Sequence, residues 1–227
     1  MSFKILDWDS RFFNLKIASA ECQNNNDVNL IYEKSSSEEI DVCYIYSNKR
    51  LADLEKSGIY FEERKTFFCE SFSANNSNQL IYTELCNAMN PELLELSKIC
   101  SGSSRFHQAN NFLDSSCEKL YEIWLQNYLK DSKVFIAKLD NKILGFLCFD
   151  ITEQLGKLVL IATHTLARKK GVAKSLIQCL HKQYIKEGVK KATVLTQGNN
   201  HSACQLYLSQ GYKLESTSYL YHLWLNK

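Results

Sequence analysis

One segment in the second half of the chain, residues 157–188, restricts the fold more than any other. An apolar run, KLVLIAT, predicts a largely buried central strand, and a turn with three consecutive cations follows it. From Gly171 to Glu187, apolar residues recur at helical spacing, and Gly188 supplies a helix stop. The segment therefore predicts a strand, a glycine-containing cationic turn and an amphipathic helix.

Helices and strands alternate along much of the remaining chain. The other predicted elements are a strand at 41–47, a helix ending at Gly58 and then a strand within 49–72, an amphipathic helix at 117–131, strands at 133–140, 141–150 and 190–197, a short helix at 199–211, and one or two strands in 212–225. Residues 49–72 are predicted to form a helix, a glycine stop and a strand, and the same order recurs approximately near Gly188 and Gly211. This alternation favours an α/β (α+β) fold around a mixed sheet.

Composition limits the classes of partner. The 227 residues are 45% hydrophobic and 23% charged, with a net charge of +2, so bulk electrostatics favours neither nucleic acid nor membranes. No run of about 18 apolar residues predicts a membrane span. Asp7, Asp9 and Arg11 interrupt the N-terminus, which lacks the apolar core of a signal peptide. We therefore expect a cytoplasmic protein without a nucleic-acid partner.

The nine cysteines do not follow a metal-binding or redox pattern. Their number is odd, and no Cys-x-x-Cys pair occurs. Several lie inside apolar runs, such as Cys148 in LGFLCFD. We expect reduced, buried thiols that act as small hydrophobic groups, and no bound metal.

The cationic turn has the chemistry of an anion site. Backbone N–H groups at a helix start point toward a ligand, the helix dipole favours negative charge, and Gly171 permits a close approach. The pattern Arg168-x-x-Gly171-x-Ala173 matches neither a P-loop nor a dinucleotide-binding fingerprint. From these residues alone, a phosphate site and a solvated basic turn remain equally open.

Two motifs in this half of the chain resemble a known superfamily. LVLIATHTLARKKGVAKSLIQCL and VLTQGNNHSACQLYLSQGYKLE are similar, in this order, to the coenzyme signature and the following motif of the GCN5-related N-acetyltransferases (GNAT). The resemblance implies the GNAT fold, in which helices flank a mixed central sheet, and acetyl-coenzyme A (acetyl-CoA) as co-substrate without a metal. The coenzyme-binding residues that it implies are Leu160, Ile161, Ala162, Thr163, Arg168, Lys169, Lys170, Gly171, Val172, Ala173, Lys174 and Asn200.

The same resemblance implies roles for individual groups. The N–H groups from Lys169 to Lys174 would hold the pyrophosphate, and the main chain from Leu160 to Thr163 would follow the pantetheine arm and stabilise the thioester oxygen. Tyr207 matches the general acid that protonates the departing thiolate. The alternatives are a core aromatic for Tyr207 and a helix cap for Asn200. No cysteine has an activated setting, which favours direct transfer of the acetyl group.

A narrower resemblance runs along nearly the whole chain. LDWDSRFFNLKIASAE, SRFHQANNFL, LYEIWLQN and GYKLESTSYLYHLWL are together similar to the branch that acetylates dTDP-linked amino-deoxyhexoses, such as dTDP-4-amino-4,6-dideoxygalactose, for surface polysaccharide synthesis. It implies an N-terminal region, 1–100, that contributes to the acceptor site of an acetyltransferase domain, 101–227. The implied acceptor-site residues are Phe12, Phe13, Arg105, Phe106 and His164. Ordinary packing, a surface ion pair and a structural histidine are their alternatives.

Other readings of the sequence stay open. A GNAT enzyme could instead acetylate a protein N-terminus, a lysine or another small amine. The fold could also serve as a coenzyme-binding module without catalysis, although the presence of Asn200 and Tyr207 argues against this. A homodimer is compatible with the sequence, which does not fix the oligomeric state.

Overall fold

The computed structural model describes residues 2–57, 59–73, 80–109 and 112–225. In chain order its elements are β1 (Phe3–Ile5), α1 (Asp7–Phe13), β2 (Ile17–Glu21), α2 (Asn25–Ser37), β3 (Val42–Ser47), α3 (Ala52–Lys56), β4 (Phe61–Cys69), β5 (Tyr82–Cys86), α4 (Pro91–Ser101), α5 (Arg105–Gln108), α6 (Asp114–Lys130), β6 (Val134–Leu139), β7 (Lys142–Thr152), β8 (Leu155–Thr163), the 3₁₀ turn η1 (Thr165–Ala167), α7 (Val172–Lys186), β9 (Lys191–Gln197), α8 (His201–Ser209) and β10 (Lys213–Trp224).

The elements predicted from the sequence are confirmed, with small shifts at their ends. Asp140 and Asn141 both have positive φ, 50° and 63°, which is the geometry of the two-residue turn between β6 and β7. The tail forms one strand of 12 residues. The helix expected before Gly58 is α3, whereas Gly58 itself lies outside the described residues.

The chain divides into two compact units. Unit 1 comprises Met1–Lys65, Gln197–Asn199 and Ser216–Lys227, and unit 2 comprises Thr66–Thr196 and Asn200–Glu215. The sequence suggested a division after residue 100 instead. Residues 82–101 lie in unit 2 because β5 pairs with β6, while α4 packs on β7, β8 and α6.

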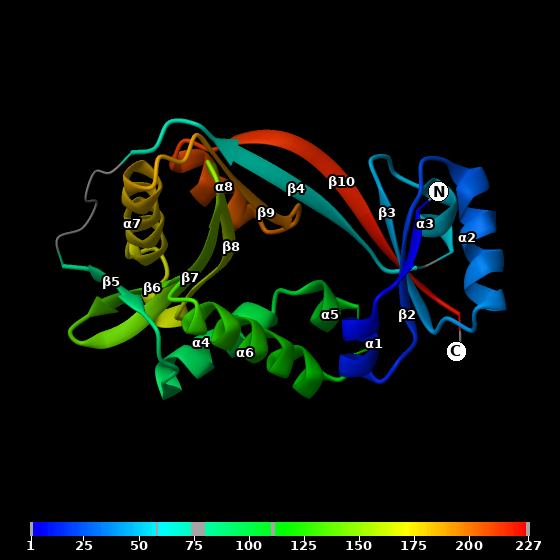
Figure 1. Ribbon diagram of the computed structural model, residues 1–227, viewed down its shortest axis with the longest axis horizontal. Coiled ribbons are helices and arrows are strands. Elements are labelled where there is room, and N and C mark those ends of the chain that lie inside the picture. The colour runs from blue at the N-terminus through cyan, green and yellow to red at the C-terminus, as the bar shows by residue number, and fades with distance from the viewer. Residues whose placement is uncertain (1, 58, 74–79, 110–111, 226–227) are drawn as a thin grey trace. The chain divides into compact units, whose positions relative to one another are not determined.

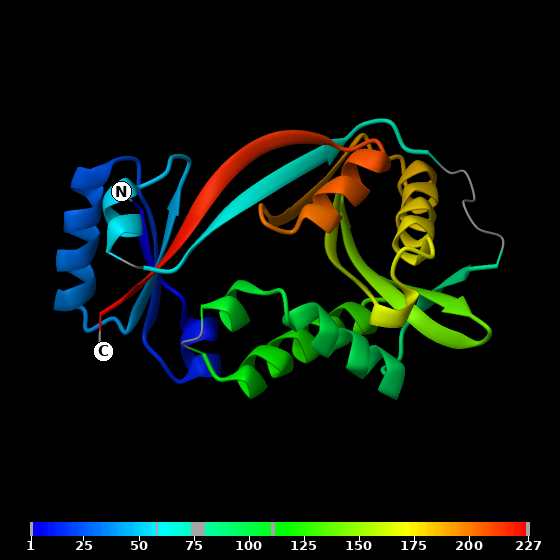
Figure 2. The ribbon, with the colours of Figure 1, turned by 180° about the vertical axis from the view of Figure 1, so that it is seen from behind.

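Unit 2 contains a mixed sheet with helices on both faces. Its strands follow the order β4-β9-β8-β7-β6-β5; β5 to β8 are antiparallel, and β8 pairs with β9 in parallel. The helix α7 lies on one side of strands β6 to β8, and α4 and α6 lie on the other (Figure 1 and Figure 2). Alternate side chains of β7 face opposite ways, because Leu147 packs with α7, whereas Phe146 packs with α4 and α6. The predicted mixed α/β architecture is confirmed.

Unit 1 repeats part of this order on a smaller scale. Its strands follow the order β1-β2-β3-β10, with β1 antiparallel to β2 and β2 parallel to β3 through the crossover helix α2. The same sequence of antiparallel pair, crossover helix and parallel strand occurs in β7, β8, α7 and β9. Ile31 of α2 is fully buried and packs in one apolar cluster with Ile45 of β3 and Tyr221 of β10.

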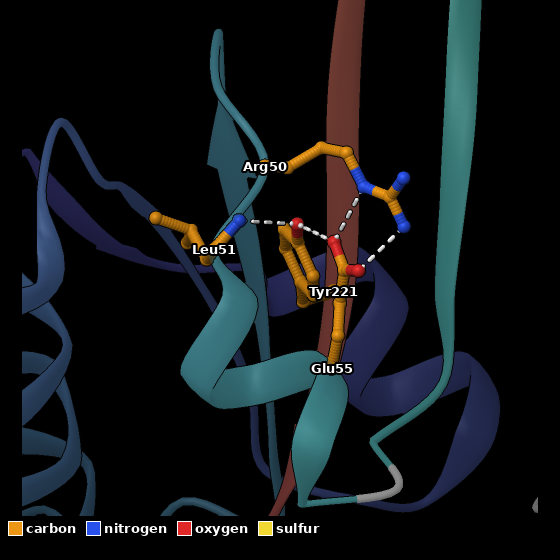
Figure 3. Close-up of polar contacts among 4 residues, drawn as sticks. All are labelled: Arg50, Leu51, Glu55 and Tyr221. Atoms are coloured by element: carbon orange, nitrogen blue, oxygen red, sulfur yellow. Dashed lines mark hydrogen bonds and ion pairs between the residues drawn. The ribbon is translucent and has the colours of Figure 1, made fainter.

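One hydroxyl group fixes α3 within unit 1. The Tyr221 hydroxyl accepts a hydrogen bond from the Leu51 N–H at 2.8 Å and donates to the Glu55 carboxylate at 3.1 Å (Figure 3). Arg50 donates to both oxygens of Glu55, at 3.0 and 2.5 Å. The buried N–H before α3 is thereby satisfied, which avoids the cost of an unpaired polar group.

A buried histidine packs among aromatic rings in unit 2. His181 of α7 is 1% exposed, and its Nδ1 lies 3.3 Å from the Ser73 backbone N. Its Nε2 and the hydroxyls of Tyr184 and Tyr212 have no hydrogen-bond partner within the described part of the chain. Burial lowers the pKa of His181 from the ordinary 6.5 to about 4, so the ring is neutral at physiological pH.

This pKa predicts a specific loss of stability in acid. Between pH 6.5 and about 4 the unfolded chain binds a proton on His181 that the native protein does not, so the free energy of unfolding falls as the pH falls. The contribution of His181 to this loss is on the order of 3 kcal/mol at the low end. Denaturant unfolding of wild type and His181→Gln across this range should show a weaker pH dependence for the variant.

The exposed His201 provides a matched control. His201→Gln should retain the wild-type pH dependence. If His181→Gln also retains the wild-type pH dependence, the native protein takes up a proton at His181 as readily as the unfolded chain does. The prediction that burial lowers the pKa of His181 is then wrong.

Candidate active site

The central feature of the site is a stretch of β8 that pairs on one side only. The parallel pairing of β8 with β9 joins Leu155–Leu158 to Lys191–Val194 and ends there. Residues 160–163, all of them described, pair with β7 but not with β9. Main-chain groups of this stretch that point away from β7 are therefore open to an extended ligand, as at a sheet edge.

A β-bulge precedes this open stretch. Leu158 lies opposite Phe149 and Leu160 lies opposite Cys148, so Val159 is an extra residue in β8. Such a bulge bends a strand and changes the direction of its later groups. The bulge therefore accounts for the separation of β8 from β9 after Leu158.

The cationic turn continues from the open stretch and ends at an uncapped helix. Lys169 and Gly171 have positive φ values of 61° and 88°, a local geometry that turns successive N–H groups toward one side. The helix α7 begins at Val172, and none of the described side chains caps it. The Ser175 N–H makes the first α-helical bond, to the Gly171 carbonyl at 2.9 Å, so the preceding N–H groups have no helical acceptor.

Charge and packing at the turn suit an anion. Arg168, Lys169, Lys170 and Lys174 are all exposed, and Val172 is buried against the sheet. The buried residue holds the helix end in place, whereas the four cationic side chains are exposed around it. The positive side chains and the positive end of the helix dipole both attract negative charge here, which favours the binding of a phosphate group.

His164 connects the open stretch of β8 to this turn. Its Nδ1 accepts the Leu166 N–H at 3.3 Å and caps η1, and its Nε2 lies 3.2 Å from the Glu95 carboxylate of α4. In the neutral ring this arrangement places the proton on Nε2 and commits the only lone pair to Leu166. The geometry thus gives His164 a capping role. The sequence did not indicate Glu95 as a partner of His164, because the two residues are 69 positions apart and no local pattern connects them.

Asn200 and Tyr207 lie on the helix that follows β9. Asn200 Oδ1 accepts the Ala203 N–H at 3.2 Å, so the predicted cap of α8 is observed. Tyr207 is 3% exposed, with its ring centroid 5.9 Å from that of Phe67. Burial, with a further contribution from the Cys100 and Cys204 thiols, raises the pKa of Tyr207, so this phenol keeps its proton at neutral pH.

The predicted acceptor-site residues are divided between the units. In unit 1, Phe12 stacks on Trp8 at 5.1 Å, and Phe13 packs edge-on against Phe12 at 4.9 Å. In unit 2, Phe106 is buried, and the Arg105 guanidinium lies 4.4 Å from the centre of its ring. Their role toward an acceptor stays a prediction.

The nine cysteines are free thiols. Burial raises the pKa of several, to about 11 for Cys43 and about 12 for Cys100. The described residues contain no group of three or more His, Cys, Asp or Glu side chains placed to hold a metal ion. Within the same described ranges, no helix is both long and apolar enough to cross a bilayer.

Comparison with known proteins identifies the domain that carries this geometry. Residues 101–212 match the sequence model of the Acetyltransferase (GNAT) family. This match covers the open stretch of β8, the cationic turn, α7 and Tyr207. A search of curated proteins found no match to this chain.

Solved structures share the fold at low sequence identity. A GCN5-related N-acetyltransferase from Sphaerobacter thermophilus aligns with a TM-score of 0.67 and 13% identity, over 99% of this chain and 76% of that one. A conserved protein of unknown function from Staphylococcus epidermidis aligns with a TM-score of 0.66 and 10% identity, over 91% and 84%. A tandem GNAT protein of clavulanic acid biosynthesis aligns with a TM-score of 0.56 and 9% identity, over 86% and 68%.

The turn geometry predicts a selective effect of replacing Gly171. Valine at φ 88° strains the backbone by roughly 1–2 kcal/mol, which favours a different conformation of the turn. We expect Gly171→Val to weaken coenzyme A binding by about tenfold or more, because the turn no longer presents its donors together. Titration calorimetry with free coenzyme A measures this change.

Gly188, at the other end of α7, is the matched control. It also has a positive φ, 69°, with no atom within 4 Å of an added Cβ. Gly188→Val should lower the free energy of unfolding by about as much as Gly171→Val does, and it should leave coenzyme A affinity within about twofold of wild type. Equal loss of affinity in both variants, or unchanged affinity in Gly171→Val, would count against the turn as the phosphate site.

Proposed function

We propose that this protein, whose residues 101–212 form a GNAT acetyltransferase domain, transfers the acetyl group of acetyl-CoA to the amino group of an acceptor. One observation carries the proposal. The open stretch of β8 leads directly into an uncapped, cationic helix start. Coenzyme A has groups that suit these two features in the same order. Its extended pantetheine arm contains amides that can hydrogen-bond to a strand, and the pyrophosphate at the end of this arm can bind to the helix start.

Main-chain groups of the protein would make more of the contacts with the coenzyme than side chains would. Leu160 to Thr163 would hydrogen-bond the pantetheine arm as an added strand would, and the N–H groups from Lys169 to Lys174 would hold the pyrophosphate. Arg168 and Lys170 would add charge. Asn200, which caps α8, would keep that helix and its Tyr207 in register beside the arm.

Chemistry would proceed by direct attack of the neutral acceptor amine on the thioester carbon. The new N–C bond forms, and a main-chain N–H of the open stretch stabilises the negative oxygen. The C–S bond then breaks, and the thiolate of coenzyme A takes the phenolic proton of Tyr207. The amine proton leaves through solvent, which also restores the proton of Tyr207. His164, committed to capping η1, would stabilise the turn rather than act as the base.

We propose the 4-amino group of a dTDP-linked amino-deoxyhexose as the acceptor. Support comes from the four sequence segments that resemble the branch acetylating such sugars, including LDWDSRFFNLKIASAE in unit 1 and SRFHQANNFL around Arg105. Phe12, Phe13 and Phe106 would contact base or sugar, and Arg105 would contact phosphate. The reaction would take place in the cytoplasm and supply a surface polysaccharide.

The first test is incubation with acetyl-CoA and a panel of dTDP- and UDP-linked 4-amino-deoxyhexoses, with products identified by mass spectrometry. Mass detection is preferable to a thiol reagent because nine cysteines would react with the reagent. We expect a mass increase of one acetyl group on one sugar nucleotide. Acetylation of peptide or simple amines alone would overturn the acceptor, and coenzyme binding without any product would overturn the catalytic proposal.

Tyr207→Phe separates binding from catalysis. Since phenylalanine fills the same space but cannot donate a proton, we expect unchanged affinity for acetyl-CoA and a turnover lower by about 10²-fold or more. Tyr212→Phe is the control, because Tyr212 is equally buried and its hydroxyl has no partner within the described part of the chain. Full turnover in Tyr207→Phe would remove this residue from the mechanism.

A further inference from the structure

The two faces of the sheet in unit 1 differ in chemistry. One face packs on α2 through an apolar cluster that includes Ile45 of β3 and Phe61 of β4. Because successive side chains of a strand point to opposite faces, Tyr46, Glu62 and Arg64 lie on the other face. This second face therefore carries an aromatic ring and two groups of opposite charge.

Arg64 is held in place on this face by its two neighbours. Its guanidinium carbon lies 5.5 Å from the centre of the Tyr46 ring, which is a cation–π distance, and its Nε lies 3.6 Å from the Glu62 carboxylate. The side chain of Arg64 is 24% exposed. A guanidinium that is stacked on a ring and confined by a carboxylate loses little further freedom when a ligand binds to it.

The Nε of Arg64 is buried without a hydrogen bond. A separation of 3.6 Å permits an ion pair but is too long for a hydrogen bond, and the described part of the chain offers this N–H no other acceptor. Buried donors that serve only to support a fold are nearly always satisfied. The arrangement thus holds a cation in position while its hydrogen-bonding capacity is not used, which favours a binding role over a purely structural one.

The place of Arg64 along the chain relates it to the candidate acid. The Gly198 N–H donates to the carbonyl of Glu63 at 2.7 Å, and both residues belong to unit 1. From Gly198 the chain leads through Asn200 into α8, which carries Tyr207. Arg64 therefore directly follows the residue to which the start of this segment is bonded.

We propose that Arg64 binds the diphosphate of the sugar-nucleotide acceptor and that Tyr46 positions its guanidinium. The planar fork of donors suits phosphate oxygens, and pairs of arginine with phosphate are commonly bidentate. The inference rests on the proposed function, in which the acceptor is a dTDP-linked amino sugar. It assigns to the acceptor a binding residue outside all four of the similar sequence segments.

The test measures binding and needs no turnover. Calorimetric titrations add dTDP to the protein saturated with coenzyme A, and coenzyme A to the protein alone, for wild type and for Arg64→Gln. The variant should bind dTDP more weakly by about tenfold or more, because it loses charge-assisted hydrogen bonds. It should bind coenzyme A within about twofold of wild type, which also shows that the variant folds.

A double-variant cycle tests the positioning role of Tyr46. Tyr46→Leu removes the ring beneath the guanidinium and should lower dTDP affinity by about threefold. Since Tyr46 acts through Arg64, Tyr46→Leu should cause no further loss when it is combined with Arg64→Gln. A loss that adds in full would show that Tyr46 does not act through Arg64.

Arg50→Gln is the matched control. The Arg50 guanidinium carbon also lies over a ring, 5.4 Å from the centre of Phe61, but on the face that packs on α2. This variant should keep dTDP affinity within about twofold of wild type.

Three results would overturn the role of Arg64 and leave the proposed acceptor standing. These are unchanged dTDP affinity in Arg64→Gln, an equal loss in Arg50→Gln, and a loss of coenzyme A affinity in Arg64→Gln as large as the loss for dTDP. If wild type binds coenzyme A but not dTDP, the proposed acceptor and this inference fall together, whereas acetyl transfer to another amine stands.

Discussion

The parallel pairing of β8 with β9 is the constraint on which the site depends. Two parallel neighbours cannot be joined by a tight turn, so the chain must cross over, and here it does so through α7. Leu176, Leu180 and Tyr184 are fully buried under this helix, and each such side chain contributes about 2 kcal/mol of apolar burial. That packing fixes α7 on the sheet, so its first turn is held in place without a cap of its own.

The two units show that this topology alone does not make a coenzyme site. In unit 1, β2 and β3 pair along their whole length, from Ile17–Val42 to Glu21–Tyr46, which leaves no open edge. The Asn24 side chain caps α2 by accepting the N–H groups of Asn26 and Asp27, and an acidic residue lies in its first turn. The same arrangement thus has a capped helix start with an acidic residue in one unit, and an uncapped helix start beside cations in the other.

The local elements around the candidate site were predictable from the sequence, whereas two helices elsewhere and the contacts between distant segments were not. The strand, turn and helix of residues 157–188 follow from apolar spacing and one glycine. The helix α4 was missed although Asn90 and Pro91 form a recognisable helix start, and α2 was missed because it is mostly polar. The bulge at Val159 depends on the register with β7. The Cys100 Sγ lies 3.9 Å from the Ile161 carbonyl oxygen, a contact that joins residues 61 positions apart, and no local pattern records it.

Burial also affects the difference in pKa between Tyr207 and the coenzyme thiolate that it would protonate. From ordinary values, a phenol near pKa 10 and a thiol near 8.5 are close enough for efficient transfer. The structure raises the pKa of Tyr207, which taken alone would make it a weaker acid. The same burial raises the pKa of the neighbouring Cys100 thiol to about 12, and a coenzyme thiolate formed beside it would meet the same apolar surroundings. A coenzyme thiol whose pKa is raised in the same way would keep the difference in pKa between donor and acceptor small, and this difference decides the direction of transfer. A buried phenol therefore remains suited to protonate a buried thiolate.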